Sequence, residues 1–357
     1  MSEAVRELPS GETLLAVRDL RVSFATEQGR ARVLDGVNFD IGRGEVVGLV
    51  GESGCGKTTL ARAILGVLPA NAARIDAGSI LFRGEPLLTL APEFVADTIR
   101  GRRITFIPQD PFASFNPLFR VAGQIDELMK WKSPRAETGR RRGLSALFAG
   151  YPRARRATDR ASVLALLRKV QIPQPETAIA KLPHEFSGGQ RQRLMIAMSL
   201  LPDPDLIIAD EPTTALDVTI QAQILKLLRA LVKERGISVL FTTHDMGTAH
   251  EICDRITVMY AGQEMETAPT CEFFARPAHP YTAKLLESLP RPGRDLRNIQ
   301  EIGGEIPALI DPPGGCRFHP RCDRASALCA RERPPPRTLG PGHAVRCHHP
   351  LFAPDRQ

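Results

Sequence analysis

The chain has 357 residues, of which 43% are hydrophobic and 24% are charged. This composition is typical of a globular protein, and the length suits one large domain with an appendage, or two domains. No apolar run approaches the roughly 20 residues that a membrane-spanning helix needs. The formal net charge of +7 is concentrated in residues 132–160, where nine Lys or Arg stand against two Asp or Glu. The rest of the chain is therefore close to neutral, so the overall positive charge is weak evidence for DNA or RNA binding.

The first residues, MSEAVRELPSGE, contain acidic side chains and no apolar core of a signal peptide. We therefore expect a cytoplasmic protein. The first hundred residues alternate β-like runs with one helical stretch at 57–68, which predicts an α/β core entered through β-rich sequence. The β-like runs are residues 14–24, 33–41, 45–50 and 78–82.

A phosphate-binding loop is predicted at residues 51–59, GESGCGKTT, which match G-x-x-x-x-G-K-[ST] between a strand and a helix. The glycines let backbone N–H groups surround a phosphate at the positive end of the helix. Lys57 adds a positive charge for the β- and γ-phosphates, and the Thr58 hydroxyl is placed to ligate Mg²⁺. The predicted nucleotide-binding residues of this loop are Gly51, Ser53, Gly54, Gly56, Lys57, Thr58 and Thr59.

A helical subdomain is predicted at about 116–203, because strand signals vanish there and apolar residues recur at helical spacing. It contains the basic stretch 132–160, with Arg140, Arg141 and Arg142. We interpret this stretch as a solvated excursion. The sharper hypothesis is that it contacts anionic lipid headgroups.

Two carboxylates follow the next predicted strand, the apolar run 206–209. Asp210 and Glu211 thus emerge at the carboxyl edge of a buried strand, where α/β sheets bind ligands. Asp210 would hold Mg²⁺ through water, and Glu211 would orient and deprotonate an attacking water. A helix at 218–235 and strands at 238–242 and 255–260 then complete a parallel sheet.

Residues 186–190, FSGGQ, resemble the signature LSGGQ of the ATP-binding-cassette (ABC) family, with Phe in place of Leu. Their residue types would open a helix whose free N–H groups bind a γ-phosphate. The resemblance implies that this phosphate belongs to ATP held mainly by a partner cassette, so that two cassettes clamp two nucleotides. The signature residues carried over are Ser187, Gly188, Gly189 and Gln190.

Other family marks occur in the expected order. Gln109 resembles the glutamine that touches Mg²⁺ and the water, and Asp217 resembles the aspartate that couples the two nucleotide sites. His244 resembles the switch histidine that contacts the γ-phosphate, and Phe24 resembles the aromatic residue that stacks on adenine. The resemblance covers roughly residues 14–290 and implies an active ATPase with a RecA-like core, an antiparallel β subdomain and an inserted helical subdomain.

Two segments narrow the resemblance to ATPases of peptide and nickel importers. They are residues 109–117, QDPFASFNP, and residues 275–290, ARPAHPYTAKLLESLP. We predict a nucleotide-binding domain at 1–289, followed by a permease-type extension at 290–357. After residue 290 the chain is rich in Pro, Gly, Arg and Cys, and we expect a small cross-linked appendage there rather than another packed layer.

The extension holds four cysteines spaced C-x5-C-x6-C-x17-C, namely Cys316, Cys322, Cys329 and Cys347. Clustered thiols in a reducing compartment suggest a metal site. The region resembles that of dipeptide and oligopeptide permease ATPases, some of which hold a [4Fe–4S] cluster. Zinc ribbons usually present C-x2-C pairs, which are missing here, so we favour the cluster over zinc and over free thiols. A mixed site remains open with His319, His343, His348 and His349.

The resulting prediction is the ATP-hydrolysing subunit of a peptide importer at the cytoplasmic face of the membrane. Its expected partners are two polytopic permease subunits, a second cassette that is a copy or a related chain, and indirectly an extracytoplasmic substrate-binding protein. The alternatives are an importer of nickel or another small solute, an exporter, and a soluble ABC ATPase acting on nucleic acid or ribosomes.

Overall fold

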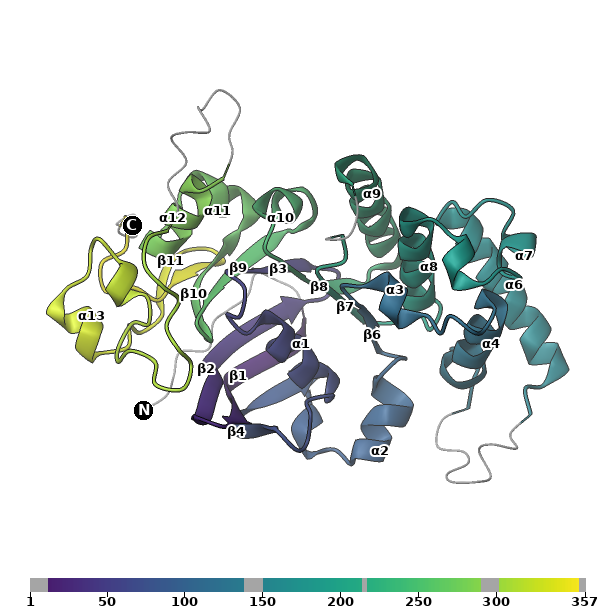
Figure 1. Cartoon of the computed structure of the whole chain (residues 1–357), viewed down its shortest axis with the longest axis horizontal. Coiled ribbons are helices and arrows are strands. Elements are labelled where there is room, and N and C mark those ends of the chain that lie inside the picture. The colour runs from purple at the N-terminus through teal and green to yellow at the C-terminus, as the bar shows by residue number, and fades with distance from the viewer. Residues whose placement is uncertain (1–11, 138–149, 214–216, 290–301, 353–357) are drawn as a thin grey trace. The chain divides into compact units, whose positions relative to one another are not determined.

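The computed structural model describes residues 12–137, 150–213, 217–289 and 302–352 (Figure 1). Two compact units make up the chain. The first unit is formed by residues 1–88 and 241–357, and the second by residues 89–240. Arg140, Arg141 and Arg142 of the basic stretch lie outside the described residues, as do Ala215 and Leu216 before Asp217.

The first unit begins with an antiparallel sheet in the order β2-β1-β4-β5. Its longest strands pair over most of their length, from Leu15 opposite Ile41 to Thr26 opposite Gly29. The β-like runs of the sequence are confirmed here, although the strands extend beyond them. The elements are β1 (Thr13–Thr26), β2 (Gly29–Gly42), β4 (Ala73–Phe82), β5 (Glu85–Pro86) and η1 (Leu87–Thr89).

A second sheet in the same unit carries the core, in the order β11-β12-β10-β9-β3. β3 (Val46–Val50) and β9 (Arg255–Tyr260) run parallel, with Val47 opposite Arg255, and both strands are buried along their whole length. Continuous apolar runs are typical of strands covered on both faces. The remaining elements are α1 (Lys57–Leu65), β8 (Ser238–Thr243), which leads in from the second unit, α10 (Met246–Ile252), β10 (Gln263–Pro269), α11 (Thr270–Ala275) and α12 (Pro280–Glu287).

The C-terminal extension continues this sheet, which corrects the expectation of a merely cross-linked appendage. β12 pairs with β10, with Glu266 opposite Val345. Glu264 and Glu266 of β10 are buried, and the extension supplies their partners: Arg346 lies 2.7 Å from Glu264, and His343 lies 2.8 Å from Glu266. Buried carboxylates need such partners, so the extension supplies the side chains that β10 requires. The elements are η5 (His319–Arg321), α13 (Ala327–Arg331), β11 (Arg337–Gly340) and β12 (His343–Val345).

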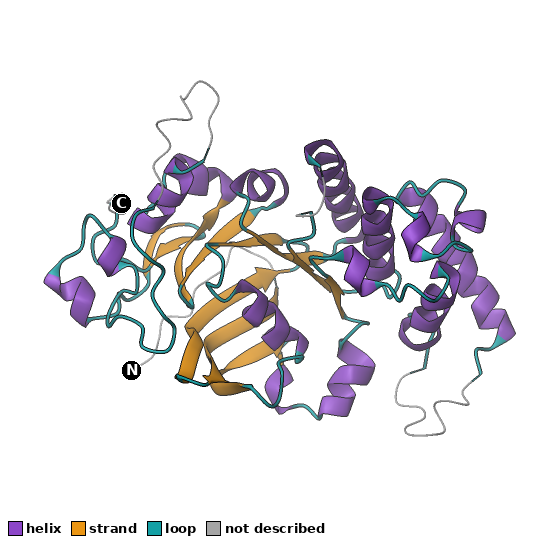
Figure 2. Cartoon of the chain, in the orientation of Figure 1, coloured by secondary structure: helices purple, strands orange, loops and turns teal. Residues whose placement is uncertain are grey.

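The second unit is mainly helical, as Figure 2 shows, and this confirms the predicted helical stretch. It also contains β6, which the sequence analysis did not predict, parallel to β7 with Ile107 opposite Ala209. Within the described residues, no helix is both long and apolar enough to span a membrane. The elements are α2 (Pro92–Phe94), η2 (Val95–Ile99), β6 (Ile104–Ile107), α3 (Pro111–Ser114), α4 (Val121–Lys132), α6 (Arg153–Lys169), α7 (Pro175–Ala178), η3 (Pro183–Glu185), α8 (Gly188–Leu200), β7 (Leu206–Asp210) and α9 (Val218–Arg235).

Candidate nucleotide site

The phosphate-binding loop joins β3 to α1 in the first unit and needs its glycines for steric reasons. Gly51 has φ 150° and Gly56 has φ 110°, values that L side chains rarely adopt. A Cβ on Gly51 would lie 2.2 Å from the carbonyl oxygen of Met259, and one on Gly56 would lie 2.8 Å from a methyl group of Leu34. The loop is therefore pressed against β9 and β2, with its backbone turned toward the start of α1.

Lys57 begins α1, and its side chain is buried within the loop. The ammonium donates hydrogen bonds to the carbonyl oxygens of Gly51 at 2.7 Å and Glu52 at 3.2 Å. A positive charge thus lies inside a ring of backbone groups, which is the arrangement that binds a polyphosphate. Cys55 is buried beside it, and burial raises the pKa of its thiol, so this cysteine is an inert neighbour.

His244 lies beside the same loop. It follows β8 directly, and the next residue, Asp245, caps α10 by accepting a hydrogen bond from the N–H of Gly247 at 2.9 Å. One open pocket of about 390 Å³ is lined by His244 together with Gly51 and Glu52. The structure therefore brings the predicted histidine to the predicted phosphate loop.

The two carboxylates end β7 in the second unit. Asp210 is buried, whereas Glu211 is partly exposed and has a left-handed backbone with φ 47°. Such a conformation costs a non-glycine residue on the order of 1–3 kcal/mol and is typical of functional sites.

Gln109 joins Glu211 because β6 runs parallel to β7, so that both strands end at the same edge of the sheet. Its amide donates a hydrogen bond to a carboxylate oxygen of Glu211 at 3.2 Å. The sequence predicted Glu211 from its position after a buried strand, and it predicted Gln109 from the family resemblance. The strand that brings them together was missed, because four residues give little periodicity.

The signature forms a capped helix start in the second unit. Ser187 Oγ accepts a hydrogen bond from the N–H of Gln190 at 3.3 Å, and Gln190 Oε1 accepts one from the N–H of Ser187 at 3.0 Å. This reciprocal pair is a capping box. A Cβ on Gly189 would lie 2.9 Å from a methyl group of Ile220 in α9, so Gly189 is required where these two helices meet. Gly188, the first residue of α8, leaves its N–H at the helix start.

Asp217 and Phe24 are the two remaining predicted nucleotide residues. Asp217 caps α9, accepting a hydrogen bond from the N–H of Ile220 at 2.9 Å. Phe24 is half-buried on β1, opposite Ala31 and Ala73.

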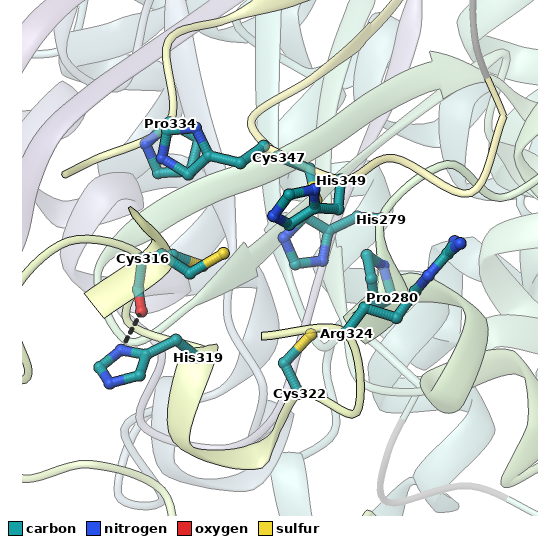
Figure 3. A pocket seen from close by; sticks show the side chains of 11 residues that line it. His279, Pro280, Cys316, His319, Cys322, Arg324, Pro334, Cys347 and His349 are labelled. Atoms are coloured by element: carbon teal, nitrogen blue, oxygen red, sulfur yellow. Dashed lines mark hydrogen bonds between the residues drawn. The ribbon is translucent and has the colours of Figure 1, made fainter. Parts of the chain in front are cut away.

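The four cysteines of the extension line one small cavity of about 10 Å³. Figure 3 shows Cys316, Cys322 and Cys347 around the ring of His279. Burial raises the pKa of Cys347 to about 12 and that of Cys316 to about 11, and the nearby thiols add to both shifts. Within the described residues, no group of three or more His, Cys, Asp or Glu has the arrangement of a metal site.

His279 is a member of this cavity that the sequence analysis did not single out. Its Nδ1 accepts a hydrogen bond from the N–H of Tyr281 at 3.0 Å, which leaves the ring proton on Nε2. Nε2 is buried and has no hydrogen-bond partner among the described residues. Burial lowers the pKa of His279 to about 4, so the ring is neutral at pH 7. Nothing near His279 in the sequence indicated that its ring lies in this cavity.

Comparison with known proteins identifies two families along the chain. Residues 34–214 match the model of the ABC transporter family, and residues 265–329 match the oligopeptide/dipeptide transporter C-terminal region. The first match contains the phosphate-binding loop, the signature and both carboxylates. The second contains three of the four clustered cysteines.

Individual relatives match almost the whole chain. A probable peptide ABC transporter ATP-binding protein of Sinorhizobium fredii is 44% identical over 95% of this chain and 96% of its own length. The oligopeptide transport ATP-binding protein of Salmonella typhimurium is 40% identical over 98% of both chains. Among solved structures, an ATP-binding cassette in a dimeric post-hydrolysis state with ADP and phosphate has a TM-score of 0.58 and 25% identity, and the match covers 72% of this chain and 98% of that one.

Proposed function

This chain belongs to the ABC transporter family and is an ATPase of that family, and we propose that its ATP hydrolysis drives the import of peptides. The observation that carries the proposal is the match of residues 265–329 to the oligopeptide/dipeptide transporter C-terminal region. The relatives named above are peptide and oligopeptide transport proteins over nearly the same length.

Residues 51–59 bind the phosphates of ATP in this proposal. The buried Lys57 ammonium exchanges its bonds to the loop carbonyls for phosphate oxygens. Thr58 and Gln109 offer the oxygen donors that Mg²⁺ prefers, and Asp210 holds the ion through water. When bound there, Mg²⁺ would supply positive charge against the β- and γ-phosphates. Phe24 stacks on adenine in this proposal.

Hydrolysis requires a base beside the attacking water, and Glu211 takes that role. Its bond to Gln109 fixes the carboxylate at the edge of β7. His244 holds the γ-phosphate from the phosphate-loop side, where it lines the same pocket as Gly51. Proton transfer to a placed carboxylate accelerates such reactions by about 10²–10⁴.

The second half of each nucleotide site comes from another cassette. The capped start of α8, with Ser187, Gly188, Gly189 and Gln190, presents N–H groups to the γ-phosphate of the partner's ATP. Asp217, at the start of α9, links the two sites. Closing around two nucleotides moves two membrane permease subunits, so the chain works as a peripheral subunit on the cytoplasmic face, supplied by a substrate-binding protein outside. Residues 1–289 form the nucleotide-binding domain, and residues 290–357 form the extension.

Uptake of labelled peptides tests this function. A strain that lacks the chain is expected to lose uptake of radiolabelled di- and oligopeptides. The wild-type chain restores it, and Lys57→Ala does not. Unchanged peptide uptake together with lost uptake of nickel or another solute overturns the peptide assignment.

We also propose that the four cysteines bind a [4Fe–4S] cluster. They line one cavity, thiolates are soft ligands that suit iron–sulfur centres, and the unpaired N–H of His279 is available to a sulfur atom. The described cavity has room for little more than one water-sized sphere, so the cysteines must move apart to admit a cluster. Zinc is the alternative that needs less movement.

Metal analysis of anaerobically purified protein decides between these occupants. A cluster predicts about four irons and four sulfides per chain and broad visible absorption, all lost in Cys322→Ser. Cys271→Ser is the matched control, because this exposed cysteine lies outside the cavity. Stoichiometric zinc in a colourless protein, or no metal at all, contradicts the cluster.

A further inference from the structure

Arg321 connects the C-terminal extension to the phosphate-binding loop. It ends the short helix η5, directly before Cys322, and its side chain is only 4% exposed. The two terminal nitrogens of its guanidinium contact the two carboxylate oxygens of Glu52, at 2.9 and 3.2 Å. This is a bidentate ion pair, the geometry that fixes orientation as well as charge.

All five N–H donors of Arg321 have acceptors. Besides the two bonds to Glu52, Nη1 donates to the hydroxyl of Tyr260 at 3.1 Å. Nη2 donates to the carbonyl of Ile302 at 2.8 Å, and Nε donates to that of Gly303 at 2.9 Å. A guanidinium offers five donors in a fixed fork, so this surrounding is specific for arginine.

Glu52 is the second residue of the phosphate-binding loop, and it is held from three sides. Its carboxylate binds Arg321, its N–H donates to the hydroxyl of Tyr281 at 3.2 Å, and its carbonyl accepts from the Lys57 ammonium at 3.2 Å. Arg321 and Tyr281 lie outside the loop, on η5 and α12. The conformation of the loop therefore depends on residues more than two hundred positions away in sequence.

The charge of Glu52 matters because the loop binds an anion. A carboxylate beside a polyphosphate repels it, and the repulsion is strong where water is partly excluded. Arg321 neutralises that carboxylate and turns it toward the extension. Removing the guanidinium leaves a negative charge free at the edge of the phosphate site.

We propose that Arg321 is a positioning residue for nucleotide binding: by pairing with Glu52, it gives the C-terminal extension control over the shape and charge of the phosphate-binding loop. The inference rests on the proposed nucleotide role of residues 51–59. It gives the extension a direct effect on the affinity for ATP, separate from any metal or cluster that its cysteines bind.

The test measures ATP affinity in a double-mutant cycle of Arg321→Ala and Glu52→Gln. Arg321→Ala is expected to raise the Kd for Mg-ATP about tenfold or more, with kcat at saturating ATP changed less than about threefold, because the groups that activate water are untouched. Adding Glu52→Gln removes the unpaired charge and is expected to bring the Kd back to within about threefold of wild type.

Arg317→Ala is the matched control. Arg317 is also buried, belongs to the same extension and is likewise adjacent to a clustered cysteine, but its guanidinium pairs with Asp35 at 2.9 Å, outside the phosphate-binding loop. The Arg317→Ala variant is expected to have a lower free energy of unfolding and an unchanged Kd for Mg-ATP. If Arg321→Ala does not fold, Arg321→Lys keeps the charge without the fork and is expected to give an intermediate Kd.

Three outcomes are distinguishable. An unchanged Kd in Arg321→Ala, or a raised Kd that Glu52→Gln fails to restore, overturns the positioning role and indicates a structural contact only. A wild-type chain that binds no Mg-ATP overturns the proposed nucleotide site itself. Rescue by Glu52→Gln is the result that a purely structural role does not produce.

Discussion

The Gln109 side-chain amide donates a hydrogen bond to the Glu211 carboxylate at 3.2 Å. Both residues stand just past the ends of parallel strands, and Glu211 has a left-handed backbone. The hydrogen bond from Gln109 fixes the direction of the Glu211 carboxylate.

Glu211→Gln is expected to bind Mg-ATP and to lose hydrolysis by about 10²-fold or more, because an amide cannot accept the proton of water. A closed dimer should accumulate with ATP, detectable by size-exclusion chromatography. Gln109→Ala removes the orienting bond and one proposed Mg²⁺ donor but keeps the base, so it is expected to lose less activity. Near-normal turnover in Glu211→Gln would remove Glu211 from the base role.

Lys57→Ala is expected to weaken ATP binding at least tenfold, because Lys57 carries the one positive side chain among residues 51–59 and is buried in the loop. Isothermal titration with Mg-ATP measures this directly. Lys226→Ala, an exposed lysine on α9, is the control and should bind ATP as the wild type does. Equal affinities for the two variants would contradict the role given to Lys57.

Ser187→Asp separates the structural task of this residue from its proposed task at the nucleotide. Aspartate is as good a helix cap as serine, so the stability of α8 is expected to persist, whereas Ser187→Ala should cost about 1 kcal/mol. The added negative charge repels a γ-phosphate. ATP-dependent dimers of Glu211→Gln should therefore disappear when Ser187→Asp is added, and their persistence would argue against the signature contact.

Asp35→Asn tests how firmly the extension is fixed to β2. Burial alone would raise the pKa of Asp35, but Arg317, Gln263 and nearby arginines outweigh it and hold the pKa below 3.8. A carboxyl group whose pKa is lowered by folding adds to the free energy of unfolding. This contribution is present above pH 3.8 and is lost as the pH falls through the pKa of the folded state.

Urea unfolding is expected to show a loss of about 2 kcal/mol for Asp35→Asn between pH 5 and 7, shrinking below about pH 4. Asp323→Asn provides the contrast, because Asp323 is exposed and its pair with Lys284 at 2.8 Å is worth less than about 1 kcal/mol. A loss for Asp35→Asn that did not change with pH would point to packing instead of charge.

Sequence alone predicted the elements with strong local patterns and missed those that depend on distant partners. β3, α1, β7 and α9 follow from apolar periodicity and from glycines at defined positions. β6 is too short to show a period. The hairpin β11–β12 pairs with β10 and supplies the partners of the buried Glu264 and Glu266, whose burial no local pattern reveals.

The nucleotide motifs were identifiable for the same reason, since residues 51–59 and 186–190 are contiguous. The contacts between these motifs and the rest of the chain could not be identified from the sequence. Arg321 stands among many arginines of the extension, and nothing beside it in sequence distinguishes it from the exposed ones. Only the folded chain shows that Glu52 is its partner.

The pairing of Glu52 with Arg321 joins residues 269 positions apart, and this has a consequence for synthesis. At roughly 5–20 residues per second, a ribosome makes the phosphate-binding loop tens of seconds before its distal arginine emerges. A nascent chain that has already made β3 and α1 on either side of the loop still lacks the group that neutralises Glu52. The proposed role of Arg321 therefore postpones high-affinity nucleotide capture until residue 321 has been made.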